Sequence, residues 1–191
     1  MFHWKRPLYP RPVRILLITN AVILVAAYMI GPIMALFVEE LGGGLFEAAA
    51  TTGIFALTSG VVSLWMGRLT DRVREQEYIV MLGYLLSGIG FAMYLFVHSV
   101  WSLFLVQILI GVAAAVYSPA FDALLSKHTP KDHPGTSWGT WESIDSFSQG
   151  IGAFVGGAIA SLLGFQPLFV ILACMCLITA LYIYALPRSE L

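Results

Sequence analysis

Long apolar stretches separated by short polar breaks run through the whole chain. A helix that crosses a bilayer needs about 20 mostly apolar residues. Six stretches reach that length: residues 15–38, 48–66, 78–97, 103–125, 138–163 and 167–186. The breaks between them are too short to hold a soluble domain. The pattern therefore predicts an all-α, polytopic membrane protein with six transmembrane helices.

Composition supports this prediction. Of the 191 residues, 59% are hydrophobic and only 11% are charged, whereas soluble domains carry about 25% charged residues. The first apolar stretch follows several basic residues, as a signal peptide would. It is longer than the apolar region of a signal peptide, and five more spans follow. We therefore expect it to be a retained first helix.

Basic residues lie on one side of the expected spans only. The ten Lys and Arg residues are Lys5, Arg6, Arg11, Arg14, Arg68, Arg72, Arg74, Lys127, Lys131 and Arg188. The opposite loops carry Glu39, Glu40 and Glu47 instead. Because basic loops stay in the cytoplasm, we expect an integral protein of the cytoplasmic (inner) membrane with both termini inside. Residues 1–14 would form an N-terminal arm, 15–187 the bundle and 188–191 a tail.

A proline motif occurs twice, three spans apart. The first span contains Gly31-Pro32 and the fourth contains Ser118-Pro119, and each pair is followed by a helical run. Three spans reverse the direction of the chain, so these segments would belong to 3+3 inverted repeats, an architecture of many secondary transporters. Proline is also frequent in membrane helices generally, which leaves a chance match open.

The loop after the second span carries the most specific motif. Residues 67–74 read Gly-Arg-Leu-Thr-Asp-Arg-Val-Arg. This resembles the major facilitator superfamily motif Gly-x-Leu-Ala-Asp-Arg-x-Gly-Arg-Arg/Lys, with matches at Gly67, Leu69, Asp71 and Arg72. The sequence departs from it at Thr70 and again from Arg74 onward. The alternative is a basic topology loop that contains an aspartate.

Two further stretches resemble the same family. Gln107 and Gly111 follow an Arg-x-x-x-Gly pattern, with Gln107 in place of the arginine. The fifth span follows the spacing of the family's glycine-rich antiporter motif at Gly139, Ser148, Gly152, Ala153, Gly156 and Gly157. Small residues at such spacings also serve ordinary helix packing. We expect packing by Gly111, Gly152, Gly156 and Gly157.

The resemblance implies a single six-helix half of a major facilitator bundle, most like the N-terminal half. The family's two halves are parallel repeats, so two copies of this chain could pair as a parallel homodimer. Asp71 would then face the start of the partner's fifth span, near Trp138, where a helix N-terminus favours a carboxylate. The expected cytoplasmic latch comprises Gly67, Arg68, Leu69, Asp71, Arg72 and Glu142.

Ionisable residues at membrane depth are costly and are therefore functional candidates. Asp145 and Asp122 are our candidates for proton coupling; Glu142 lies nearer the interface, where a solvated charge is an equal alternative. Asp122 could instead pair with Lys127 or with the loop that carries Lys131. The candidates for a cavity wall are Asn20, Tyr28, Gln107, Ser118 and Gln149. Each of these could equally form an interhelical hydrogen bond.

The expected function is secondary active transport of a small solute by alternating access, in contact with membrane lipid. The alternative is a non-transporting membrane subunit, or a half that pairs with a different chain. We expect no enzyme, cofactor, metal site or nucleic-acid partner. Cys174 and Cys176 lie in an apolar run and are expected to be buried. Nothing in the sequence identifies the substrate.

Overall fold

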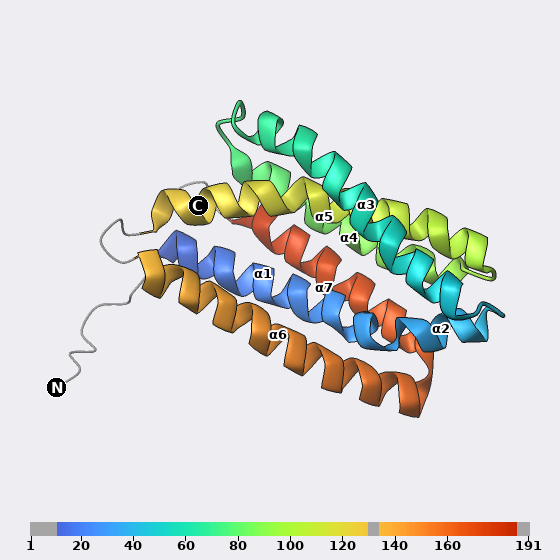
Figure 1. Ribbon diagram of the computed structural model, residues 1–191. Helices are drawn as coiled ribbons and strands as arrows, with labels where there is room; N and C mark the ends of the chain where they lie inside the picture. The colour runs from blue at the N-terminus through green and yellow to red at the C-terminus, as the bar shows by residue number, and fades with distance from the viewer. Residues whose placement is uncertain (1–10, 130–133, 187–191) are drawn as a thin grey trace.

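The computed structural model describes residues 11–129 and 134–186, and these residues form a bundle of long helices (Figure 1). The elements are α1 (Arg11–Ile30), the 3-10 helix η1 (Gly31–Ile33), α2 (Met34–Glu40), α3 (Leu45–Thr70), α4 (Gln76–Met93), the 3-10 helix η2 (Tyr94–Phe96), α5 (Val100–His128), α6 (Pro134–Leu163) and α7 (Phe165–Ala185). The described residues contain no strand.

Six of these helical segments are long and apolar enough to cross a membrane, which confirms the six expected spans. The first span runs through α1, η1 and α2, and the third runs through α4 and η2. Most spans extend a turn or so beyond their apolar stretches, because interfacial polar residues continue the helix. Thus α1 begins at Arg11, inside the range expected for the N-terminal arm, and α6 begins at Pro134 rather than near Trp138.

The two proline motifs behave differently in the fold. Pro32 lies in η1, where the first span changes from α-helix to 3-10 helix and back. Pro119 lies inside the continuous helix α5. Proline removes one backbone donor and crowds the preceding turn, so both positions weaken their helices. Only the first shows a break.

Pairs of helices pack in an arrangement that agrees with 3+3 inverted repeats. Helix α3 lies along α5, α1 lies along α6, and α4 contacts both α5 and α7. An inverted repeat makes the first, second and third spans equivalent to the fourth, fifth and sixth. Helix α1 then corresponds to α5 and α3 to α6, so the pair α3–α5 corresponds to the pair α6–α1. Glycine permits the closest approaches: a Cβ added at Gly111 would lie 2.8 Å from the carbonyl oxygen of Phe55.

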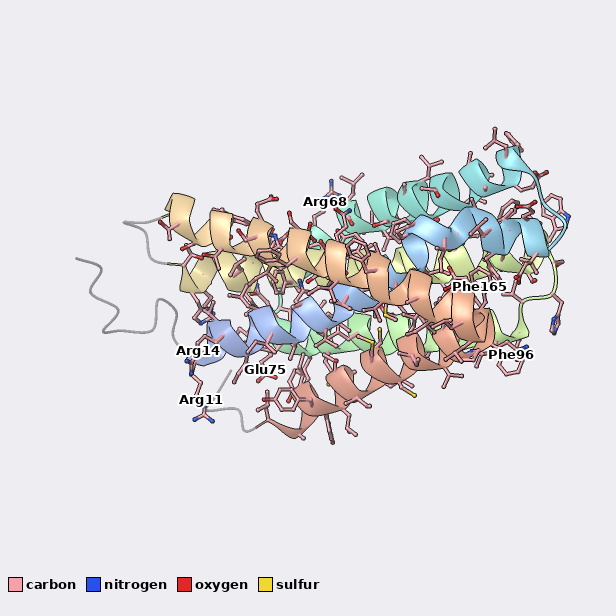
Figure 2. The ribbon with its side chains drawn as sticks, turned by 90° about the horizontal axis from the view of Figure 1, so that it is seen from below. Arg11, Arg14, Arg68, Glu75, Phe96 and Phe165 are labelled. Carbon is pink, nitrogen blue, oxygen red and sulfur yellow. The ribbon has the colours of Figure 1, made fainter. Side chains whose placement is uncertain are left out.

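The two ends of the bundle differ in charge. Arg11 and Arg14 lie at one end, where the α3–α4 turn also lies, and Phe96 and Phe165 lie at the other (Figure 2). That second end also carries the acidic residues at the end of α2 and the start of α3. There Gly164, with φ 85°, joins α6 directly to α7, in a left-handed conformation that glycine adopts without steric penalty.

The two cysteines do not share one environment. Cys176 is buried, as expected, but Cys174 is exposed on α7, so the expectation of burial is wrong for Cys174. Neighbours two apart on a helix point to different faces, which accounts for the difference.

Candidate transport site

A hydrogen bond between two spans brings two of the predicted residues together. The Tyr28 hydroxyl on α1 donates to Oδ1 of Asp145 on α6, at 3.0 Å. Asp145 lies 11 residues into α6, or about 16 Å along its axis at 1.5 Å per residue. The acceptor is therefore a half-buried carboxylate at membrane depth. Within the described chain its second oxygen, Oδ2, accepts no hydrogen bond, so it is open to a proton or to a cationic group.

Two residues of α5 complete a carboxylate–tyrosine cluster, which we define as Tyr28, Tyr117, Asp122 and Asp145. Tyr117 lies close enough to Tyr28, Asp122 and Asp145 to be within range of their charges. Contact between α5 and α6 near this cluster comes from Phe121 and Trp141, whose ring centroids lie 4.7 Å apart. Helices α1, α5 and α6 thus each contribute a polar side chain to this cluster.

Gly152 allows the close helix contact that positions Tyr28 in the cluster. A Cβ added at Gly152 would lie 2.7 Å from the carbonyl oxygen of Val25 and 2.8 Å from Cβ of Tyr28. Only glycine therefore allows α1 and α6 to approach this closely. Side chains on a helix lean toward its N-terminus, so the Tyr28 side chain runs back toward Asp145, two turns before Gly152. Gly156 continues the same contact, against Met29.

A second interhelical hydrogen bond lies in the interior of the bundle. The Tyr84 hydroxyl on α4 donates to Oδ1 of Asn20 on α1, at 2.9 Å, and both residues are buried. The rings of Tyr84 and Tyr117 meet edge to face, with centroids 5.1 Å apart. A Cβ added at Gly83 would lie 2.8 Å from the backbone nitrogen of Tyr117. Close packing of α4 against α5 therefore holds Tyr117 in the cluster.

The other predicted cavity residues divide into two groups. Asn20 and Gln107 lie inside this half of the bundle, where Gln107 contacts the Met34 sulfur at 3.9 Å. Ser118 and Gln149 are exposed, as are Glu142 and Asp122. Among the described residues Asp122 and Lys127 form no ion pair, so the alternative that paired them is not supported; Lys131 lies outside the described residues. A Cβ added at Gly157 would meet nothing within 4 Å among the described residues, so the packing predicted for Gly157 stays a prediction.

The predicted latch residues lie at the basic end of the bundle. Asp71 follows the last residue of α3, and its backbone N–H donates to the carbonyl of Gly67 at 3.1 Å. Arg68, Leu69, Asp71 and Arg72 are exposed. No ion pair joins Glu142 to either arginine in the part of the chain that the structure describes. The expected partner of Asp71 was the start of the fifth span, near Trp138. Because α6 begins at Pro134, that helix N-terminus lies about one turn before Trp138.

Two helices of this half are covered least. Only 6% of the apolar window of α3 and 17% of that of α6 is buried, against 39–50% in the other spans. Both belong to the helix pairs, α3–α5 and α6–α1, that adjoin the cluster. The exposed surface of α3 and α6 is therefore where this half has room for further contacts.

Sequence comparison explains the architecture. Residues 16–191 match the Major Facilitator Superfamily. The chain belongs to the major facilitator superfamily. Among its relatives, the Multidrug resistance proteins MdtG of Salmonella arizonae and Salmonella paratyphi B are each 30% identical over 177 residues. These matches cover 91% of this chain and 44% of each relative, so the chain spans less than half the length of these relatives.

A solved structure has the same fold. A crystal structure of the peptide transporter POT, an E310Q mutant in complex with alafosfalin, superposes with a TM-score of 0.73. Its identity to this chain is 21%, over 92% of this chain and 38% of the transporter. The family membership and the six apolar helices establish an integral membrane protein related to transporters, not to enzymes.

Tyr117 is the member of the cluster that sequence reasoning missed. It directly precedes Ser118, which was predicted, but the four residues on either side of it include no charged side chain. Nothing local therefore distinguishes it from an interfacial or core tyrosine. Only the approach of α1 and α6 to α5 gives it Tyr28 and Asp145 as neighbours.

Proposed function

We propose that this chain is one six-helix half of a secondary active transporter that moves a small solute by alternating access. The observation that carries the proposal is the Tyr28–Asp145 hydrogen bond, which joins two spans at membrane depth. A carboxylate placed at such depth is expensive and therefore a functional candidate. The relatives' name, Multidrug resistance protein, makes a lipophilic small molecule a sensible first substrate to test.

Protonation of Asp145 would couple a proton gradient to the contact between α1 and α6. A hydrogen bond to an ionised acceptor is roughly twice as strong as a bond between neutral groups. Uptake of a proton by Asp145 would therefore weaken its bond from Tyr28 and loosen α1 from α6 at that level. Asp122 offers a second carboxylate in the same cluster and is the next candidate for the proton site. Proton binding and helix movement would thus be linked through one contact.

A second six-helix half would supply the other wall of the transport pathway. Our choice for it is a second copy of this chain, arranged as a parallel homodimer with an isologous interface. The support is the low burial of α3 and α6, which leaves surface for such a contact. Stoichiometry in nanodiscs tests this choice. A particle with one copy of this chain and a different half would replace the homodimer with a mixed pair, and a transporting monomer would exclude both.

The loop after α3 would act as the latch of this assembly. With the basic end in the cytoplasm, as the positive-inside rule suggests, Asp71 would meet the N-terminus of α6 in the second half when the cytoplasmic side is closed. Glu142 would lie about two turns further along that helix, within reach of Arg68 or Arg72. These contacts would break when the pathway opens inward.

Transport in proteoliposomes tests the coupling. Efflux or uptake of a fluorescent lipophilic dye is measured with an imposed pH gradient, and dye exchange is measured without one. We expect Asp145→Asn to abolish the pH-driven component and to leave exchange partly intact. Glu142→Gln, the matched control on the same helix, should do less because Glu142 lies nearer the interface. Unchanged pH dependence in Asp145→Asn would place the coupling group elsewhere, with Asp122 next.

The second candidate function is a non-transporting membrane subunit. This function would be favoured if the chain bound a different membrane protein stably and supported neither pH-driven transport nor exchange. Because the same proteoliposome assay measures both processes, the two functions give different results in one experiment.

A further inference from the structure

A groove between α1 and α7 lies outside the carboxylate–tyrosine cluster. Its volume is about 540 Å³, and its walls are formed by Ile15, Ile18 and Val22 on α1 and by Cys174, Ile178 and Tyr182 on α7, among others. The wall is open to the surroundings of the bundle, since Ile18 is 66% exposed and Ile178 is 67% exposed. No residue of α3 or α6, the two least covered helices, lines it.

The groove offers hydrocarbon and almost no hydrogen bonds. Its two threonines are satisfied by their own helices: Thr19 donates to the carbonyls of Ile15 and Leu16, at 3.0 Å each, and Thr179 donates to Met175 at 2.7 Å. Their methyl groups are therefore what remains to pack against an occupant. The hydroxyl of Tyr182 lies on the half of α7 nearer the basic end. An occupant matched to this wall is apolar along its body.

The dimensions fit one acyl chain. Along α7 the groove runs from Val170 to Tyr182, or about 18 Å at 1.5 Å per residue. One leaflet of a bilayer is about half of a 30 Å hydrocarbon core, roughly 15 Å. A whole helix, about 10 Å across with its side chains, is wider than an acyl chain and would lie against the open groove rather than within it. Only side chains of a neighbouring helix could enter it.

Charge is placed where a phospholipid headgroup would lie. Arg11 and Arg14 precede Ile15 and Ile18 by four residues each, so both stand on the face of α1 that forms the groove wall. Figure 2 shows both arginines at the start of α1, at the same end of the bundle as Glu75. Arg11 is already engaged in an interaction. Arg14 is exposed and forms no ion pair among the described residues, so it is available to a phosphate.

We propose that this groove is a binding site for an anionic phospholipid, with one acyl chain between α1 and α7 and its phosphate at Arg14. Basic groups at the membrane end of an interhelical pocket are a recurrent way to hold anionic lipid headgroups. Glu77 lines a small pocket with Ile15, Leu16 and Thr19 of α1, and Glu75 lines one at the end of α7. Both carboxylates would repel an anion beside α4, which leaves the exposed Arg14 side of α1 as its place. The site is separate from the transport cluster.

Photo-crosslinking in nanodiscs tests the proposal with the full chain. The probe is phosphatidylglycerol that carries a diazirine in one acyl chain, and the zwitterionic comparison is phosphatidylcholine with the same group. Crosslinked peptides are mapped by mass spectrometry. We expect the phosphatidylglycerol crosslinks to concentrate on residues 15–22 and 170–182. Crosslinks spread evenly over all lipid-facing helices, with either lipid, would overturn the proposal.

Two pairs of variants sharpen the test. Ile178→Trp fills the groove and should remove most of its crosslinks, whereas Leu181→Trp, at a position on α7 that is 65% exposed and does not line the groove, should keep them. Arg14→Gln should reduce the preference for phosphatidylglycerol about five-fold, the effect of one basic side chain near an anionic surface. Lys127→Gln, at the same end on α5, should leave the preference unchanged.

A last measurement separates lipid from protein in the groove. Cys174 lies on the groove wall and is exposed, so a bifunctional maleimide can report whether two copies meet there. We expect no Cys174-linked dimer. Efficient linkage of two copies through Cys174, or unchanged crosslinking in Ile178→Trp, would refute the lipid site. Neither result would alter the pH-driven transport expected of the cluster.

Discussion

Replacement of Gly152 by alanine tests whether helix contact positions the carboxylate–tyrosine cluster. The added Cβ would lie 2.7 Å from a backbone oxygen of Val25 and 2.8 Å from Cβ of Tyr28. Neither neighbour is the end of a flexible side chain, so neither can rotate away. Ordinary contact begins at 3.4 Å, and α1 and α6 must therefore separate by 3.4 − 2.8 = 0.6 Å or more.

That separation is enough to break the hydrogen bond in the cluster. If Tyr28 and Asp145 part by the same amount, their 3.0 Å bond lengthens to roughly 3.6 Å, a distance that no longer counts as a hydrogen bond. Overpacking of a tight contact costs typically 1–3 kcal/mol, and an interhelical hydrogen bond in a membrane contributes about 0.6 kcal/mol. Alanine favours the helix over glycine by up to about 1 kcal/mol, which offsets part of the loss. We expect a net destabilisation of about 1–2 kcal/mol.

The matched control lies two residues away on the same helix. A Cβ added at Gly150 would meet nothing within 4 Å, so Gly150→Ala should be neutral or slightly stabilising. Both variants are compared with the parent chain by reversible unfolding in mixed micelles, and pH-driven dye transport is measured alongside. Equal unfolding free energies for Gly152→Ala and Gly150→Ala would refute the reasoning. So would destabilised Gly152→Ala protein that retains full pH-driven transport.

Three further predictions concern single interactions. In a double-mutant cycle of Tyr28→Phe and Asp145→Asn, the coupling energy should be about 0.6 kcal/mol and no more than about 1.7 kcal/mol; additive effects on unfolding would mean that the 3.0 Å bond does not contribute. Tyr84→Phe should cost about 1–3 kcal/mol, because it leaves the buried Asn20 oxygen without its donor, and the exposed Tyr182→Phe serves as its control. Asp71→Asn should weaken cytoplasmic closure by up to about 1 kcal/mol, read as increased labelling of a cysteine introduced on the cytoplasmic side of the pathway; unchanged labelling would reduce the loop to a topology signal.

The number and type of the elements could be predicted from local sequence alone. A span needs only enough apolar residues to cross the hydrocarbon core, because every backbone group is satisfied within its own helix. The same local rule accounts for the count of six spans, and the side of the basic residues follows from their places between those spans. The ends of the helices were less well predicted. Helix α6 begins a turn before Trp138, because polar residues at an interface can continue a helix without lipid around them.

The direction in which each polar side chain points was not predictable. A membrane helix is apolar toward lipid and toward its neighbours alike, so a pattern of apolar positions does not identify the buried face. Asn20 and Gln107 were predicted to line a cavity but lie inside the bundle, and Tyr117 was assigned no role but lies beside two carboxylates. The place of Tyr117 follows from how α4 and α5 pack at Gly83.

The sequence by itself determined that this chain enters the membrane six times, that its basic loops share one side, and that its family is that of major facilitator transporters. Those properties depend on composition and spacing along one segment at a time. Only the tertiary structure decided that Asp145 accepts a hydrogen bond from Tyr28, that a Cβ added at Gly152 but not at Gly157 would meet a neighbouring helix, and that α1 and α7 leave a groove. Each of these depends on how closely helices distant in the sequence approach one another, and differences of a few tenths of an ångström in that approach decide the contact.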